Sequence, residues 1–152
     1  MTDLPNETGT AAPERATRLL IVDDEADVRA AMARVLRRAG FEVRLADNAE
    51  HAIAALRAES ADLVITDMIM PRQNGAELIR TLKQEFPAIH IVAISGGGNF
   101  WPQGYRPDAI TTSAYLAAAR TAGADAVLAK PFEIVELLEL VRAVLAGERA
   151  AR

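Results

Sequence analysis

Short apolar runs alternate with segments of helical periodicity along most of the chain. The run at 63–66 lacks polar alternation, which is typical of a central strand buried on both faces. By contrast, Phe41, Val43 and Leu45 alternate with Glu42 and Arg44, which indicates a half-exposed strand near a sheet edge. Together with three similar runs, the pattern predicts strands at 19–22, 41–45, 63–66, 89–94 and 126–129.

A helical apolar stripe follows each of these runs. After the first run, apolar residues from Val28 to Leu36 recur at helical spacing, and Gly40 stops the segment as a C-terminal cap would. Asn48 can cap the second helix. The last helix carries the longest stripe, from Ile134 to Leu145. The remaining stripes are centred on Ile53 and Leu56, on Leu78, Ile79 and Leu82, and on Leu116 in an alanine-rich helix that ends near Gly123.

Five strand-helix units in succession predict an α/β fold. Repeated strand-helix-strand order implies right-handed crossovers and a parallel sheet with helices on both faces, since that topology covers continuously apolar strands. We therefore expect a five-stranded parallel doubly wound sheet flanked by five helices.

Length and composition indicate one domain. A chain of 152 residues with 51% hydrophobic content suits a single core, which we place at 18–146. Residues 1–17 are expected to be a disordered leader because they are poor in large apolar side chains and lack the pattern of a signal peptide. Residues 147–152 are expected to be a short polar tail. No run approaches about 18 apolar residues, so we predict no membrane span and a cytoplasmic location.

Net charge and cysteine content limit which partners and which metal ligands are expected. A formal net charge of -4 argues against a dominant basic surface, so direct nucleic acid binding is not expected. The absence of cysteine excludes disulfides and thiolate metal sites. Any metal site must therefore use oxygen ligands, as hard cations do.

Polar residues stand at the ends of four of the predicted strands. Asp23 and Asp24 follow the first, Asp67 the third, Ser95 the fourth and Lys130 the fifth. The carboxyl ends of parallel strands meet at one edge of the sheet, where ligands of open α/β folds bind. Three carboxylates, a hydroxyl and an ammonium at one edge predict a site for a metal ion and a phosphate.

With this ordered set, the chain resembles the receiver domain of two-component response regulators over roughly residues 18–146. The match includes the acidic pair, the segment from Asp67 to Pro71, Gly75, Ser95, and Lys130 with Pro131 and Phe132. The resemblance implies a flavodoxin-like sheet of order 2-1-3-4-5 and a cis peptide between Lys130 and Pro131.

The resemblance and phosphate chemistry together assign roles. Asp67 is expected to be the phosphoacceptor, and Mg²⁺ the cofactor that relieves the repulsion between the acids. We expect Asp24, Asp67 and the Ile69 backbone carbonyl to bind the ion directly, with Asp23 acting through water. Ser95 and Lys130 are expected to contact the phosphoryl oxygens.

Each residue also has a plainer interpretation. Asp23 or Asp24 could cap the helix that starts near Glu25, Ser95 could be a loop hydroxyl, and Lys130 could be a solvated charge. Only their combination favours the site.

Three functions fit this interpretation. The leading one is a stand-alone receiver phosphorylated by a sensor histidine kinase, acting on an unknown protein target as a monomer or weak homodimer and catalysing only its own phosphorylation and dephosphorylation. The alternatives are a relay intermediate to a histidine phosphotransfer protein and a pseudo-receiver that only binds partners.

Two departures from the family pattern concern signal output. Receivers commonly carry Tyr or Phe three residues before the lysine, where this chain has Val127. An extended loop at about 96–110 contains Trp101, the only tryptophan. We expect this loop to be either a mobile surface segment or a switch that replaces the missing ring, and it makes the usual receiver dimer doubtful.

Overall fold

The computed structural model describes residues 15–70, 73–95, 109–147 and 150–151. Within them, six parallel strands form one sheet in the order β2-β1-β3-β6-β7-β8. Their bounds are β1 (Arg18–Val22), β2 (Glu42–Ala46), β3 (Leu63–Asp67), β6 (His90–Ser95), β7 (Ala126–Ala129) and β8 (Ala150–Ala151). A separate antiparallel pair, β4 (Ile69–Met70) and β5 (Gln73–Asn74), follows β3.

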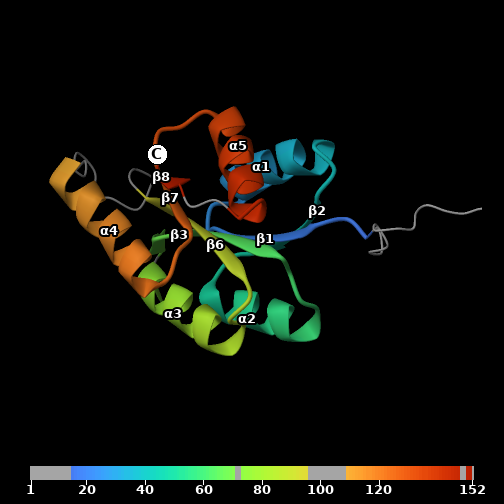
Figure 1. Cartoon of the computed structure of the whole chain (residues 1–152), viewed down its shortest axis with the longest axis horizontal. Coiled ribbons are helices and arrows are strands. Elements are labelled where there is room, and N and C mark those ends of the chain that lie inside the picture. Colours follow the sequence, from blue (N-terminus) through green and yellow to red (C-terminus); the bar gives the residue numbers. More distant parts are fainter. Residues whose placement is uncertain (1–14, 71–72, 96–108, 148–149, 152) are drawn as a thin grey trace, which may run out of the picture.

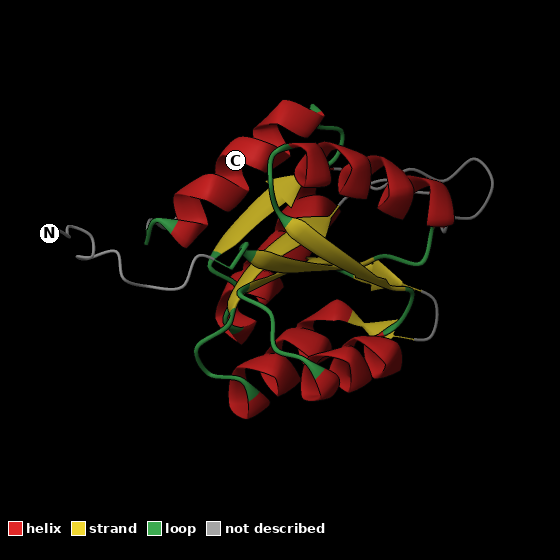
Figure 2. Cartoon of the chain, turned by 90° about the vertical axis from the view of Figure 1, so that its right-hand side faces the viewer, coloured by secondary structure: helices red, strands yellow, loops and turns green. Residues whose placement is uncertain are grey.

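Five helices of the described chain cover both faces of this sheet. They are α1 (Ala26–Arg38), α2 (Ala49–Ala58), α3 (Gly75–Glu85), α4 (Ala109–Ala122) and α5 (Ile134–Leu145). Figure 1 shows α1 and α5 on one face and α2, α3 and α4 on the other. The turned view in Figure 2 shows the sheet between the two helical layers. The predicted doubly wound fold and the order of its five main strands are confirmed.

The hydrophobic core consists of two clusters, one on each face of the sheet. Leu19 and Ile21 of β1 point toward α1 and α5 and pack with Met32, Leu36 and Leu140. Leu20 and Val22 of the same strand join the cluster on the other face, with Ala52, Ile79 and Ala119 among its members. Strands that alternate between two buried faces are continuously apolar, which explains the runs in the sequence.

The predicted helix ends are also present. The Asn48 side chain accepts a hydrogen bond from the backbone N–H of His51, 2.7 Å away, and so caps α2. Gly40 after α1 and Gly123 after α4 have φ values of 102° and 124°, in the left-handed region that favours glycine. The sequence therefore located these helix ends correctly.

Two details differ from the sequence-based expectation. Leu45 of the edge strand β2 is 41% exposed, although the alternation placed it on the apolar side with Val43. Strand β8 lies within the segment predicted to be a tail and pairs with the outer edge of β7. Its two alanines carry no pattern that predicts a strand.

The boundaries of two predicted segments also shift. Arg15 forms an ion pair with Asp62, and the Thr17 carbonyl accepts from the N–H of Glu42, so the fold begins before residue 18. Residues 1–14 of the predicted leader lie outside the described residues. Most of the predicted aromatic loop, with Trp101, also lies outside them, and α4 already begins at Ala109. None of the helices in the described part of the chain is long and apolar enough to cross a membrane.

Candidate functional site

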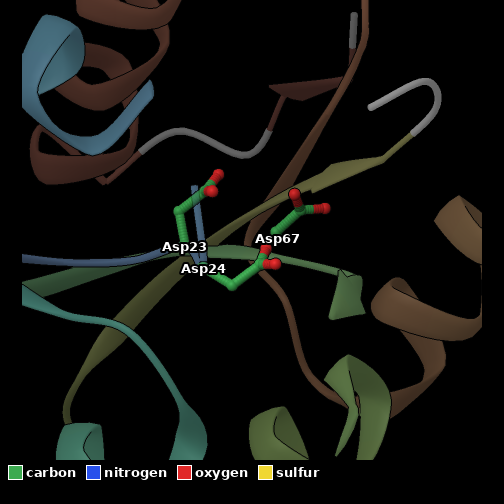
Figure 3. Close-up of side chains that lie close together, drawn as sticks. All are labelled: Asp23, Asp24 and Asp67. Atoms are coloured by element: carbon green, nitrogen blue, oxygen red, sulfur yellow. The ribbon is translucent and has the colours of Figure 1, made fainter. Parts of the chain in front are cut away.

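Three acidic side chains meet at the carboxyl edge of the sheet. Asp23 and Asp24 follow β1, and Asp67 ends the neighbouring strand β3. Each offers a carboxylate oxygen, and these oxygens all lie within 4.8 Å of one another. Figure 3 shows the three side chains gathered beyond the strand ends. Asp23 is 1% and Asp67 4% exposed, while Asp24 is half-buried, so the predicted acid cluster is present and two of its three residues are almost fully removed from water.

The environment opposes ionisation of all three acids. Burial raises the pKa of Asp67 to about 6, and nearby Asp23 contributes, while Lys130 opposes the rise. Burial is also the main cause of the raised pKa values of Asp23 and Asp24. Clustered carboxylates in low dielectric repel one another, and a divalent cation would remove that penalty.

The donor set fits a hard cation. All three side chains offer oxygen, as Mg²⁺ and Ca²⁺ prefer. Asp24 Oδ1 is buried and has no hydrogen-bond partner within the described part of the chain. A buried carboxylate oxygen without a donor is costly, and coordination to a cation would satisfy it.

Lys130 and Ser95 complete the cluster from the next two strands. Lys130 follows β7, and its Nζ lies 3.3 Å from Asp67 Oδ2. Its backbone N–H donates to the Ser95 carbonyl across 2.8 Å. The peptide bond between Lys130 and Pro131 is cis, as the family resemblance implied.

The Ser95 hydroxyl is buried inside the structure. Ser95 is 0% exposed, and among the residues that the structure describes nothing pairs with its Oγ. Hydroxyls are rarely left in this state, because an unpaired buried donor costs about 1–3 kcal/mol. A phosphoryl oxygen bound near Asp67 would provide the missing acceptor.

The turn after β3 is fixed by a close backbone approach. A Cβ atom at Gly75 would lie 2.6 Å from the Cα of Met68 and 2.9 Å from the Asp67 carbonyl oxygen. Only glycine fits there without displacing the backbone that carries Asp67. The Ile69 N–H donates to Asp67 Oδ1 at 3.2 Å, while the predicted role of the Ile69 carbonyl as a metal ligand stays a prediction.

The acidic pair does not act as the helix cap. The N-cap residue of α1 is Glu25, whose own side chain makes no capping bond. Asp23 Oδ1 instead accepts the N–H of Glu25 at 2.8 Å, one residue before the helix begins. The Asp24 carboxylate does not cap the helix and lies in the acid cluster.

Sequence reasoning missed Arg29. Its Nη1 donates to the backbone carbonyl of Asp23 at 2.6 Å, directly beside the acid cluster. A cation one turn into a helix is unfavourable for the helix dipole, and this is a weak signal in the sequence that the Arg29 side chain has a partner outside its helix.

Comparison with known proteins supports the resemblance to receiver domains that the sequence indicated. Residues 19–103 match the family model for the response regulator receiver domain. A response regulator receiver protein of Anaeromyxobacter sp. (strain Fw109-5), Anae109_2439, is 36% identical over 123 residues, covering 81% of this chain and 46% of the relative. The DNA-binding transcriptional regulator NtrC of Rhizobium meliloti (strain 1021) is 31% identical over 128 residues, covering 84% of this chain and 24% of NtrC.

Solved structures agree with this match. The crystal structure of the receiver domain of NtrX from Brucella abortus has a TM-score of 0.72 at 30% identity, covering 86% of this chain and 99% of that one. The chain spans less than half the length of the two curated relatives described above. The similarity therefore concerns this one domain. Whatever the other parts of those longer proteins do is a property of those proteins.

Proposed function

The chain belongs to the response regulator receiver domain family, and from this premise we propose that Asp67 accepts a phosphoryl group from a histidine kinase or a histidine phosphotransfer protein in a Mg²⁺-dependent reaction. The observation that carries the proposal is the buried Asp67 carboxylate, 3.3 Å from the Lys130 ammonium and beside two further acids. An acceptor for an anionic group needs such compensating charge.

In the proposed step, a carboxylate oxygen of Asp67 attacks the phosphorus of the donor phosphohistidine. The new oxygen-phosphorus bond forms as the phosphorus-nitrogen bond breaks, and the electron pair leaves with the imidazole. Asp67 must be ionised to attack, and a pKa of about 6 leaves it mainly ionised near neutral pH. The product is an acyl phosphate on Asp67.

Lys130 and Ser95 would hold the transferred group. The Lys130 ammonium places a positive charge beside Asp67, where the phosphoryl oxygens carry negative charge. The buried Ser95 hydroxyl, which has no hydrogen-bond partner among the described residues, would donate to one of these oxygens. Ser95 ends β6 and Lys130 directly follows the neighbouring strand β7, so both can respond to modification of Asp67.

Asp24, Asp67 and the Ile69 carbonyl would hold Mg²⁺ directly, and Asp23 would hold it through water. When bound, the ion neutralises charge on the acids and on the phosphoryl oxygens. Asp23 accepts the Glu25 N–H, which orients its carboxylate at the edge of the cluster. The oxygen donors and their raised pKa values support this assignment.

Phosphotransfer from the histidine kinases of the source organism tests the proposal. We expect intact-mass analysis to show one phosphoryl group per chain with Mg²⁺, and none after chelation. The Asp67→Asn variant should stay unmodified, whereas Asp47→Asn, which removes an exposed acid, should be modified normally. Labelling of the Asp67→Asn variant, or of the wild type without a divalent cation, would contradict the assignment.

The same assay separates the remaining functions. Rapid return of phosphoryl from Asp67 to a histidine phosphotransfer protein would identify a relay intermediate. A protein that binds no Mg²⁺ and is modified by no kinase would be a binding module. We expect neither result, and we expect the phosphorylated domain to act through contacts with another protein.

A further inference from the structure

Arg29 makes a short contact at the loop between β1 and α1. Its Nη1 donates to the Asp23 carbonyl oxygen at 2.6 Å, and the contact is partly buried. That oxygen belongs to the peptide unit that joins Asp23 to Asp24. The hydrogen bond therefore restricts rotation of the peptide plane that precedes Asp24.

The other contacts of the loop fix Asp23 more firmly than Asp24. The Asp23 N–H donates to the Ala46 carbonyl of β2 at 3.1 Å, and Asp23 Oδ1 accepts the Glu25 N–H at 2.8 Å. Asp24 Oδ1, by contrast, is without a hydrogen-bond partner in the described residues. Rotation of the peptide before Asp24 would swing this carboxylate relative to Asp67. Arg29 is the side chain that holds this peptide.

We propose that Arg29 is a positioning residue, which sets the cation affinity of the acid cluster by holding the peptide between Asp23 and Asp24. The inference rests on the proposed function, because it assumes that the cluster binds Mg²⁺. The proposal also predicts that loss of Arg29 changes the Mg²⁺ affinity in the direction opposite to the one expected from its charge alone. Arg29 contributes to the electrostatic environment of Asp23, so loss of its positive charge alone should strengthen cation binding. Loss of positioning should weaken it.

Calorimetric titration with Mg²⁺ at fixed ionic strength distinguishes the two effects. The variants are Arg29→Gln, Arg29→Lys and, as a control, Arg34→Gln, which removes the same charge from an exposed position of α1. We expect Arg29→Gln to raise the Kd for Mg²⁺ roughly three- to tenfold, the range that one hydrogen bond provides. Arg34→Gln should leave the Kd unchanged or lower it slightly.

Arg29→Lys keeps the charge and one donor for the Asp23 carbonyl, so it should recover part of the lost affinity. A Kd for Arg29→Gln equal to or below that of Arg34→Gln would overturn the proposal. So would an Arg29→Lys variant that binds no better than Arg29→Gln. Circular dichroism without metal verifies that each variant is folded.

The design also separates this inference from the function it rests on. If neither the wild type nor Arg34→Gln binds Mg²⁺, the proposed metal site itself fails. If both bind and Arg29→Gln binds equally well, only the role of Arg29 fails.

Discussion

Replacing Asp67 with asparagine should make the metal-free protein more stable at neutral pH, although it removes the proposed acceptor. The reason is that Asp67 is almost fully buried, and its pKa is raised from 3.8 to about 6, mainly by burial. The ionised form is therefore less stable in the folded protein than in the unfolded chain. Asparagine has nearly the same shape and resembles the neutral form at every pH.

The raised pKa sets both the sign and the size of the effect. The folded protein holds the Asp67 proton more tightly than the unfolded chain does. The contribution of this proton to the free energy of unfolding is therefore complete below about pH 4 and is lost as pH rises through 6. One pKa unit corresponds to about 1.4 kcal/mol, so the full loss is at most about 3 kcal/mol at pH 8. In a domain of this size, that corresponds to a difference in Tm of roughly 6–12 °C.

Thermal unfolding followed by circular dichroism, in chelator and from pH 5 to pH 8, measures this difference. The Tm advantage of Asp67→Asn should grow with pH. Mg²⁺ should raise the Tm of the wild type. At a Mg²⁺ concentration 100 times the Kd, the free energy of unfolding should increase by about 2.7 kcal/mol. The same addition should affect Asp67→Asn much less. Metal binding and substitution offset the same cost, that of an ionised carboxylate buried beside another acid, in two ways.

Asp47→Asn is the matched control. It makes the same change of charge at an exposed position, where a hydrogen bond from His51 lowers the pKa of Asp47. This variant should gain no stability at neutral pH. A metal-free Asp67→Asn protein no more stable than the wild type at pH 8, or one whose advantage is independent of pH, would refute the reasoning.

Two further substitutions test other parts of the site. Ser95→Ala should keep or raise the stability of the metal-free protein, by up to about 1 kcal/mol, because the buried Oγ has no partner among the described residues. The same variant should accept phosphoryl more slowly, and a large loss of stability in urea would show that the hydroxyl already has a partner. Gly75→Ala should destabilise the protein by about 1–3 kcal/mol, because its Cβ would collide with Met68. An unchanged urea midpoint would show that the turn yields easily.

Much of the fold could be predicted because burial on both faces leaves a direct trace in the sequence. Leu19 and Leu20 belong to different core clusters, so neither position of β1 tolerates a polar residue, and the run is visible. The exposed Leu45 and the two alanines of β8 show the limit of this signal. In both cases the outcome depends on neighbouring elements rather than on the residues themselves.

The candidate site divides in the same way. Charged side chains at strand ends are visible in the sequence, and the structure brings the acids and Lys130 together. Arg29 was missed because its partner is a backbone carbonyl, which carries no residue identity. The requirement for Gly75 was visible as part of a motif, but its cause, the approach to the Met68 backbone, exists only in three dimensions.

The strand ends predict for a physical reason that these side chains lie close together. At three of the strand ends that carry candidate site residues, a backbone hydrogen bond continues one step beyond the strand. The Asp23 N–H donates to β2, the Met68 N–H to the Ile94 carbonyl of β6, and the Lys130 N–H to the Ser95 carbonyl. Each of these candidate site residues is thus adjacent to, or part of, backbone that is still bonded to the neighbouring strand. Rigid backbone keeps repelling acids close together, since free loops would separate them. Beyond the strand end, the Asp23 carbonyl accepts a hydrogen bond from the Arg29 side chain at 2.6 Å, so the backbone next to the acids is held by a side chain as well as by the neighbouring strand.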